Sequence, residues 1–86
     1  MEFARFAELL QKHYQFPCEY TYKFVIPVQL RPIAEEILQE FSCVCVFKLS
    51  RSGRYLSINA TRSMGSVEEI IEIYQKMRII EGLISL

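Results

Sequence analysis

The side chains best suited to chemistry gather around one short turn. The dipeptide Ser52-Gly53 is flanked by two arginines, and a small polar residue followed by glycine is typical of the turn in a β-hairpin. The basic residues there, with the aromatic residue beside them, are Lys48, Arg51, Arg54 and Tyr55; we call these four the basic hairpin. Cations beside an aromatic ring suit the binding of an anion or an acidic surface. We expect this hairpin to bind a small effector or a partner protein, the alternative being solvated charges that keep a sheet edge from aggregating.

Charge is balanced over the chain but not along it. Ten basic and ten acidic residues give a formal net charge of zero, which exerts no bulk attraction on nucleic acid or on an anionic membrane. No acidic residue lies between Glu40 and Glu68, the stretch that holds the basic hairpin. Lys23 is expected on the same open sheet face, and we add it to the candidate binding residues.

The cysteines indicate a reducing compartment. Cys18, Cys43 and Cys45 are odd in number, and neither a basic leader nor a long apolar run precedes them, as expected of a cytoplasmic protein without a membrane anchor. The spacing of Cys43 and Cys45 differs from that of zinc-binding pairs, and no second pair completes a site. We expect structural thiols, no metal and no cofactor; metal or redox chemistry at this pair is the alternative.

Catalytic residue sets are poorly represented. His13 is the single histidine, and it is more simply explained as a packed or surface residue than as a general base. The sequence offers no serine–histidine or cysteine–histidine set and no glycine-rich phosphate loop. We therefore expect no enzymatic activity. The remote alternative is an acylphosphatase-like hydrolase that would use Arg31 and Asn59.

The elements that position the basic hairpin follow a regular order. Strands are expected where apolar residues alternate or run on, at 20–26, 43–49, 54–61 and 79–86. Helices are expected where apolar residues recur every three or four positions, at 2–13, 30–41 and 67–77. Ser66 and Glu69 form a capping box for the last helix. The order β-α-β-β-α-β predicts an α+β, ferredoxin-like two-layer sandwich with antiparallel strand order 4-1-3-2. We expect a helical extension over 1–14 and one domain over 15–86.

The sheet edges predict self-association. In this order the second and fourth strands lie at the edges, and their runs at 43–47 and 83–86 are apolar and uncharged. Such edges are normally covered or paired. We expect the leading helix to cover one apolar surface and an edge strand to pair with a second copy, which predicts a homodimer.

RNA binding is the runner-up function. RNA-recognition domains of this topology stack bases on aromatic residues of the open sheet face. Here that face is expected to hold Thr21, Lys23, Val25, Val44, Val46, Tyr55, Ser57 and Asn59. Because Tyr55 is its one aromatic residue, we rank nucleic acid below a small effector or a protein partner.

Two motifs carry a resemblance to a known family. Residues 16–23, FPCEYTYK, resemble the opening F-P-x-x-(F/Y)-x-(Y/F)-K of the YbeD-like family of small, uncharacterised bacterial proteins. Residues 48–57, KLSRSGRYLS, resemble its K-x-S-x-x-G-x-Y-x-S hairpin, and Glu72-Ile73-Tyr74 resembles its later tyrosine. The resemblance covers residue 15 onward and implies a fold similar to ACT domains, which bind effectors at dimer interfaces and regulate enzymes. The junction at 26–32 lacks the glycine usual in effector-binding ACT domains, so the chain departs from their amino-acid site.

Overall fold

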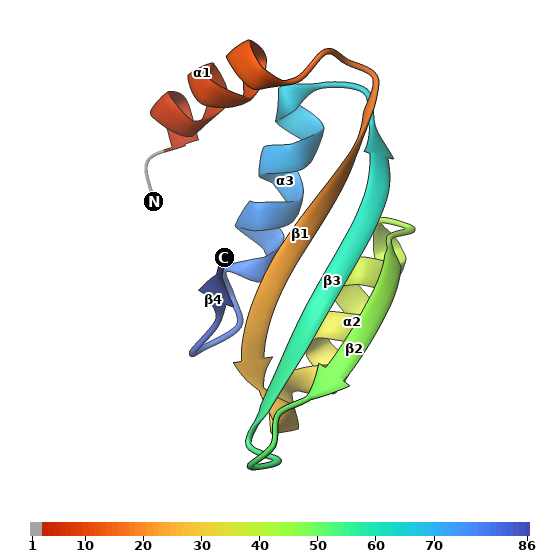
Figure 1. Ribbon diagram of the computed structural model, residues 1–86, viewed down its shortest axis with the longest axis vertical. Helices are drawn as coiled ribbons and strands as arrows, with labels where there is room; N and C mark the ends of the chain where they lie inside the picture. Colours follow the sequence, from red (N-terminus) through yellow and green to blue (C-terminus); the bar gives the residue numbers. More distant parts are fainter. Residues whose placement is uncertain (1–2) are drawn as a thin grey trace.

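The computed structural model describes residues 3–86 of the chain. Figure 1 shows the order of its elements: α1 (Phe3–His13), β1 (Cys18–Pro27), a 3-10 turn η1 (Val28–Leu30), α2 (Arg31–Glu40), β2 (Val44–Leu49), β3 (Tyr55–Met64), α3 (Val67–Met77) and β4 (Ile84–Ser85). The predicted helix at 2–13 corresponds to α1, except that Glu2 lies outside the described residues. None of the described helices is long and apolar enough to cross a membrane.

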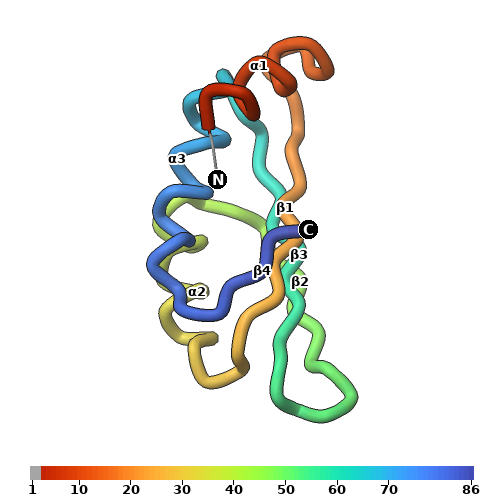
Figure 2. The backbone as a smooth tube through the Cα atoms, turned by 90° about the vertical axis from the view of Figure 1, so that its left-hand side faces the viewer, coloured from red at the N-terminus to blue at the C-terminus, as the bar shows by residue number. Residues whose placement is uncertain are grey.

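The sheet has the predicted topology. Its strands are antiparallel in the order β2-β3-β1-β4, which is the predicted 4-1-3-2 read from the other edge. The central pair is the longest, since β1 and β3 stay in register from Cys18↔Met64 to Pro27↔Tyr55. Seen edge-on in Figure 2, α2 and α3 lie on one side of this sheet. The ferredoxin-like α+β sandwich is therefore confirmed.

The last predicted strand is wrong over most of its length. The sequence predicts residues 79–86, whereas β4 comprises Ile84–Ser85. Before β4 the chain turns, because the N–H of Ile80 donates to the carbonyl of Met77 at 3.0 Å, and the Ile80 side chain is buried. Gly82 then has a φ of +81°, a left-handed conformation that does not continue a strand.

The core lies between the sheet and the helices. Every second residue of the central strands points into it, as alternation predicts; the buried members are Tyr20, Tyr22, Phe24, Ile26, Leu56, Ile58, Ala60 and Met64. The buried stripe of α3 comprises Val67, Ile70, Ile73, Tyr74 and Met77. All the helix packing is therefore on one face, and the residues between these positions form an open face.

Helix α1 packs across one end of the core (Figure 1). Leu10 is buried, and the ring of Phe6 meets that of Tyr74 edge to face, with centroids 5.3 Å apart. The guanidinium of Arg78 lies 5.5 Å from the ring centroid of Phe3. The expectation that the leading helix covers an apolar surface is confirmed.

The start of α3 is capped, with one difference from the prediction. The Ser66 Oγ accepts the N–H of Glu69 at 3.3 Å, as a capping box requires. The Glu69 carboxylate, however, accepts the N–H of Gly65 at 2.7 Å rather than that of Ser66. Its other oxygen lies 3.2 Å from a guanidinium nitrogen of Arg62. Glu69 thereby joins the beginning of the helix to the end of β3.

Candidate functional site

Local hydrogen bonds shape the turn between β2 and β3. The N–H of Ser50 donates to the carbonyl of Tyr55 at 2.8 Å, and the Ser50 Oγ accepts the N–H of Tyr55 at 3.0 Å. Gly53 has a φ of +75° and nothing within 4 Å of the place a Cβ would take. The backbone conformation, and not lack of space, therefore calls for glycine there. These bonds hold Ser50 and Tyr55 next to each other at the end of the sheet.

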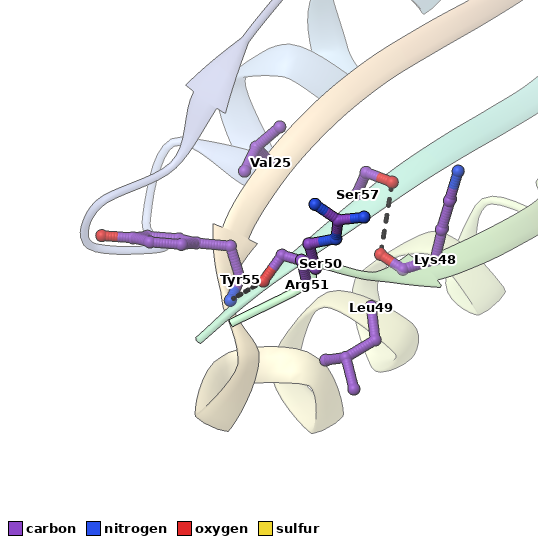
Figure 3. A pocket seen from close by; sticks show the side chains of 7 residues that line it. All are labelled: Val25, Lys48, Leu49, Ser50, Arg51, Tyr55 and Ser57. Atoms are coloured by element: carbon purple, nitrogen blue, oxygen red, sulfur yellow. Dashed lines mark hydrogen bonds between the residues drawn. The ribbon is translucent and has the colours of Figure 1, made fainter. Parts of the chain in front are cut away.

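An open hollow of about 520 Å³ lies beside this turn. Its lining residues, which define what we call the basic hollow, are Val25, Lys48, Leu49, Ser50, Arg51, Tyr55 and Ser57. Figure 3 shows the charged ends of Lys48 and Arg51 on the two sides of Ser57, whereas the Tyr55 ring extends away from both. The lining holds no acidic residue, and within residues 3–86 neither cation forms an ion pair.

The basic hollow is shallow and open to water. Lys48 and Arg51 are exposed, and Tyr55 is 47% exposed. Water and salt screen exposed charges, so that one ionic contact at such a site contributes little. A ligand must therefore engage both cations at once and gain further contact area. Val25, Leu49 and Tyr55 are the apolar and aromatic residues of the lining that can provide such area.

Arg54 belongs to a different hollow. It lines a second depression of about 450 Å³ together with Pro27, Val28, Gln29, Gly53 and Tyr55. Its carbonyl accepts the N–H of Val28 at 2.9 Å, which ties the hairpin to the end of β1. Tyr55 is the wall that the two depressions share. The structure therefore separates Arg54 from Lys48 and Arg51.

Lys23 also lies outside the basic hollow. It is exposed on β1 opposite Asn59, and its carbonyl accepts the N–H of Leu86 at 2.8 Å. It shares the open face with Lys48, as predicted, but does not line the depression. Of the five predicted binding residues, the structure brings Lys48, Arg51 and Tyr55 together.

Val25, Ser50 and Ser57 belong to the lining but were not among the predicted site residues. Ser57 pairs with Lys48 on one side and with Val25 on the other, so these three form one row across three strands. The strand register would have identified this row, because paired residues of neighbouring strands point to the same face. Ser50 lies outside this row, and the hydrogen bonds of the turn are what place it in the lining.

The residues of the hydrolase alternative lie on different layers. Arg31, at the start of α2, is paired with Glu35 and lies 4.6 Å from the ring centroid of Phe47. Asn59 is exposed on the open face of β3. His13 is exposed at the end of α1. The structure therefore does not assemble Arg31 and Asn59 into one site.

The cysteines are free and partly buried. Burial raises the pKa of the Cys43 and Cys45 thiols, which keeps them protonated and weakly nucleophilic at neutral pH. Across residues 3–86 no three histidine, cysteine or acidic side chains gather in a way that could hold a metal ion.

Comparison with known proteins covers most of the chain. A family model described as "Protein of unknown function (DUF493)" matches residues 11–85, which include the basic hollow and exclude most of α1. A protein named "UPF0250 protein" from Buchnera aphidicola subsp. Baizongia pistaciae (strain Bp) is 34% identical over 74 residues, which are 79% of this chain and 83% of that protein. No solved structure matches. These matches confirm the resemblance to the YbeD-like proteins, and the chain belongs to the DUF493 family of proteins of unknown function.

Proposed function

We propose that this protein is a small binding module without catalytic activity, whose basic hollow takes a small anionic effector. One observation carries the proposal: Lys48 and Arg51 bring two cations to one hollow whose lining has no acidic residue. Binding there would regulate a partner protein, which makes the module a regulator or adaptor. The free thiols support a cytoplasmic location, where thiols stay reduced.

The lining defines the ligand's chemistry. The Ser57 Oγ donates to the carbonyl of Lys48 at 3.3 Å. The Ser50 Oγ accepts the N–H of Tyr55 and lies 3.2 Å from the Ser52 Oγ, so both hydroxyls already serve the hairpin. The ammonium of Lys48 and the guanidinium of Arg51 are the charged donors left for a ligand. A guanidinium binds a carboxylate or phosphate with two parallel hydrogen bonds. The ligand is therefore an anion of that kind with a small apolar part that rests on Val25.

A partner protein is the second form of the proposal. The two hollows on either side of Tyr55 extend over more surface than one small anion covers. An acidic segment of a protein would reach Arg51 and Arg54 together. A small effector in the basic hollow would engage Arg51 and Lys48 but would not reach Arg54. The two arginines therefore distinguish the two forms.

RNA binding stays in second place. The open face offers Lys23, Lys48 and Asn59 as contacts to phosphate and bases. The ring of Tyr55 is directed away from Lys48 in Figure 3, so it does not form a stacking platform beside that cation. Single-stranded RNA is bound mainly by such stacking.

Thermal unfolding of the reduced protein tests the proposal. The probes are inorganic phosphate, citrate, benzoate, AMP, an oligoglutamate peptide and oligouridylate, since a ligand bound only by the native state raises the midpoint. We expect a small anion to give a saturable rise. Arg51→Gln should weaken that binding by up to about fivefold, because one exposed ionic contact contributes about 0.2–1 kcal/mol. Lys12→Gln, which removes an exposed cation from α1, is the matched control and should change nothing.

The outcomes separate the candidates. Equal binding of every probe by the wild type and Arg51→Gln would show that the basic hollow is not the site. Binding of the oligoglutamate alone, weakened by both Arg51→Gln and Arg54→Gln, would favour the partner protein. A shift with oligouridylate alone, lost in Tyr55→Ala, would move RNA to first place.

A further inference from the structure

Strand β2 has a free edge. It pairs with β3 on one side and forms the border of the sheet on the other. Backbone groups along a strand point alternately to its two sides, and the bond from the N–H of Ser50 to Tyr55 shows which alternate residues face β3. The β2 residues that point their N–H and C=O groups outward are then Cys45, Phe47 and Leu49. Within residues 3–86 no other strand is there to pair with them.

The opposite edge is less suited to pairing. Strand β4 has two residues, Ile84 and Ser85, which make too short a ladder. The part of β1 beyond it is free of β4 but carries Glu19, and a charged residue on an edge discourages pairing. Of the two borders of the sheet, β2 offers the longer continuous ladder.

Strand β2 has few of the features by which edges are protected, since Lys48 near its end is its one charged residue. Residues 41–47 contain neither a charge nor a proline, and the register with β3 runs without a bulge. Val44 and Val46 are 73% and 63% exposed on the open face. Exposed apolar edges of this kind associate unless they are covered.

A small hollow lies along the same edge on the helix side. It has a volume of about 220 Å³ and is lined by Glu35, Gln39, Cys43, Cys45 and Phe47. Glu35 and Gln39 belong to α2, Cys45 and Phe47 belong to β2, and Cys43 directly precedes β2. A strand laid against β2 would close this hollow and remove the two thiols from water.

We propose that β2 pairs antiparallel with β2 of a second copy about a two-fold axis, which joins the two sheets. This inference does not depend on the proposed ligand of the basic hollow. A second copy fits because it brings the same unpaired groups, so that one isologous contact satisfies both edges and closes the assembly. A register that places Lys48 opposite its counterpart is disfavoured by repulsion, whereas one that places Cys45 opposite its counterpart brings Val44 and Val46 together.

Charge complementarity favours the same arrangement. In an antiparallel pair, the hairpin end of β2, with Arg51 and Arg54, lies next to the beginning of the partner strand. That beginning follows the last turns of α2, where Glu36 and Glu40 are exposed. Neither glutamate forms an ion pair within residues 3–86. The basic hairpin end of β2 in each copy therefore meets the acidic end of α2 in the other copy, once on each side of the axis.

The mass of the reduced protein in solution tests this inference. Light scattering at rising concentration should approach twice the 10.1 kDa of one chain. Val46→Lys places two cations beside the axis and should yield a folded monomer at the same concentration, with a thermal midpoint that no longer rises with protein concentration. Ile84→Lys is the matched control: its residue is 53% exposed on the β4 edge, and it should leave the dimer intact.

Thiol protection provides a second measurement that needs no variant. Alkylation of Cys43 and Cys45 should slow as the wild-type protein becomes more concentrated, whereas that of Cys18, on β1, should not. A wild-type monomer at high micromolar concentration would overturn the inference. So would a dimer that survives Val46→Lys but is lost in Ile84→Lys, or thiol rates that do not depend on concentration.

Discussion

Two tyrosine hydroxyls satisfy each other inside the core. The oxygens of Tyr20 and Tyr74 are 2.7 Å apart, and both residues are buried. Tyr74→Phe keeps the ring that packs against Phe6 but leaves the Tyr20 hydroxyl without this partner. We expect the free energy of unfolding to fall by about 1–3 kcal/mol, the cost of an unsatisfied buried polar group. Urea denaturation of the reduced protein measures the change.

An exposed tyrosine serves as the control for this change. The hydroxyl of Tyr55 forms no hydrogen bond within residues 3–86, and the residue is 47% exposed. Tyr55→Phe should therefore change the free energy of unfolding by less than about 0.5 kcal/mol. Equal losses in the two variants would show that the Tyr20–Tyr74 bond does not stabilise the fold.

At the scale of the element, the start of α3 depends on one side chain. Ser66 accepts the N–H of Glu69, which otherwise has no partner at the first turn of the helix. Ser66→Ala should lower the free energy of unfolding by about 1 kcal/mol, whereas Ser66→Asp should preserve it. Urea denaturation distinguishes them. Ser63→Ala, at an exposed position of β3, is the control; a loss there as large as in Ser66→Ala would rule out the cap as the cause.

The elements differ in how far sequence patterns predict them. Alternation in β1 and β3 and helical spacing in α3 predict those elements well, because each has one buried face. The run at 79–86 is apolar throughout, so the pattern does not distinguish a strand from a turn that buries Ile80. The deciding features are the left-handed Gly82 and the packing of Ile80 below α3, and these depend on tertiary structure.

The candidate site also combines features that the local sequence predicts with features that depend on tertiary structure. The turn at Ser52-Gly53 is local, and its sequence predicts the hairpin and the cations beside it. The local sequence does not predict which residues line the basic hollow, because the lining depends on how the residues of three strands align. Val25 and Ser57 enter through the register, and Arg54 is excluded because it lies beyond Tyr55. Residue type alone does not carry that information.

At the scale of the whole molecule, the buried tyrosines link folding to alkaline pH. Burial raises the pKa of Tyr20, Tyr22 and Tyr74 in the folded protein above the ordinary value of 10.0. In the unfolded chain these phenols release their protons near that ordinary value. Above it the folded state holds more protons than the unfolded state, so folding stability falls as the pH rises. Below it both states are protonated, and the full stability is present.

The free energy of unfolding should therefore stay level from neutral pH to about pH 9, where the thiols begin to contribute, and then decline. Each buried tyrosine adds a slope of about 1.4 kcal/mol per pH unit above its unfolded pKa. Urea denaturation at a series of pH values measures this decline, and tyrosinate absorbance reports ionisation in the folded protein. Because Tyr74→Phe removes one of the three groups, its decline should be shallower than that of the wild type. A wild-type profile that stayed level well above pH 10, or tyrosinate forming near pH 10 in the folded protein, would contradict the burial argument, since either requires phenols that ionise as readily in the folded state as in the unfolded chain.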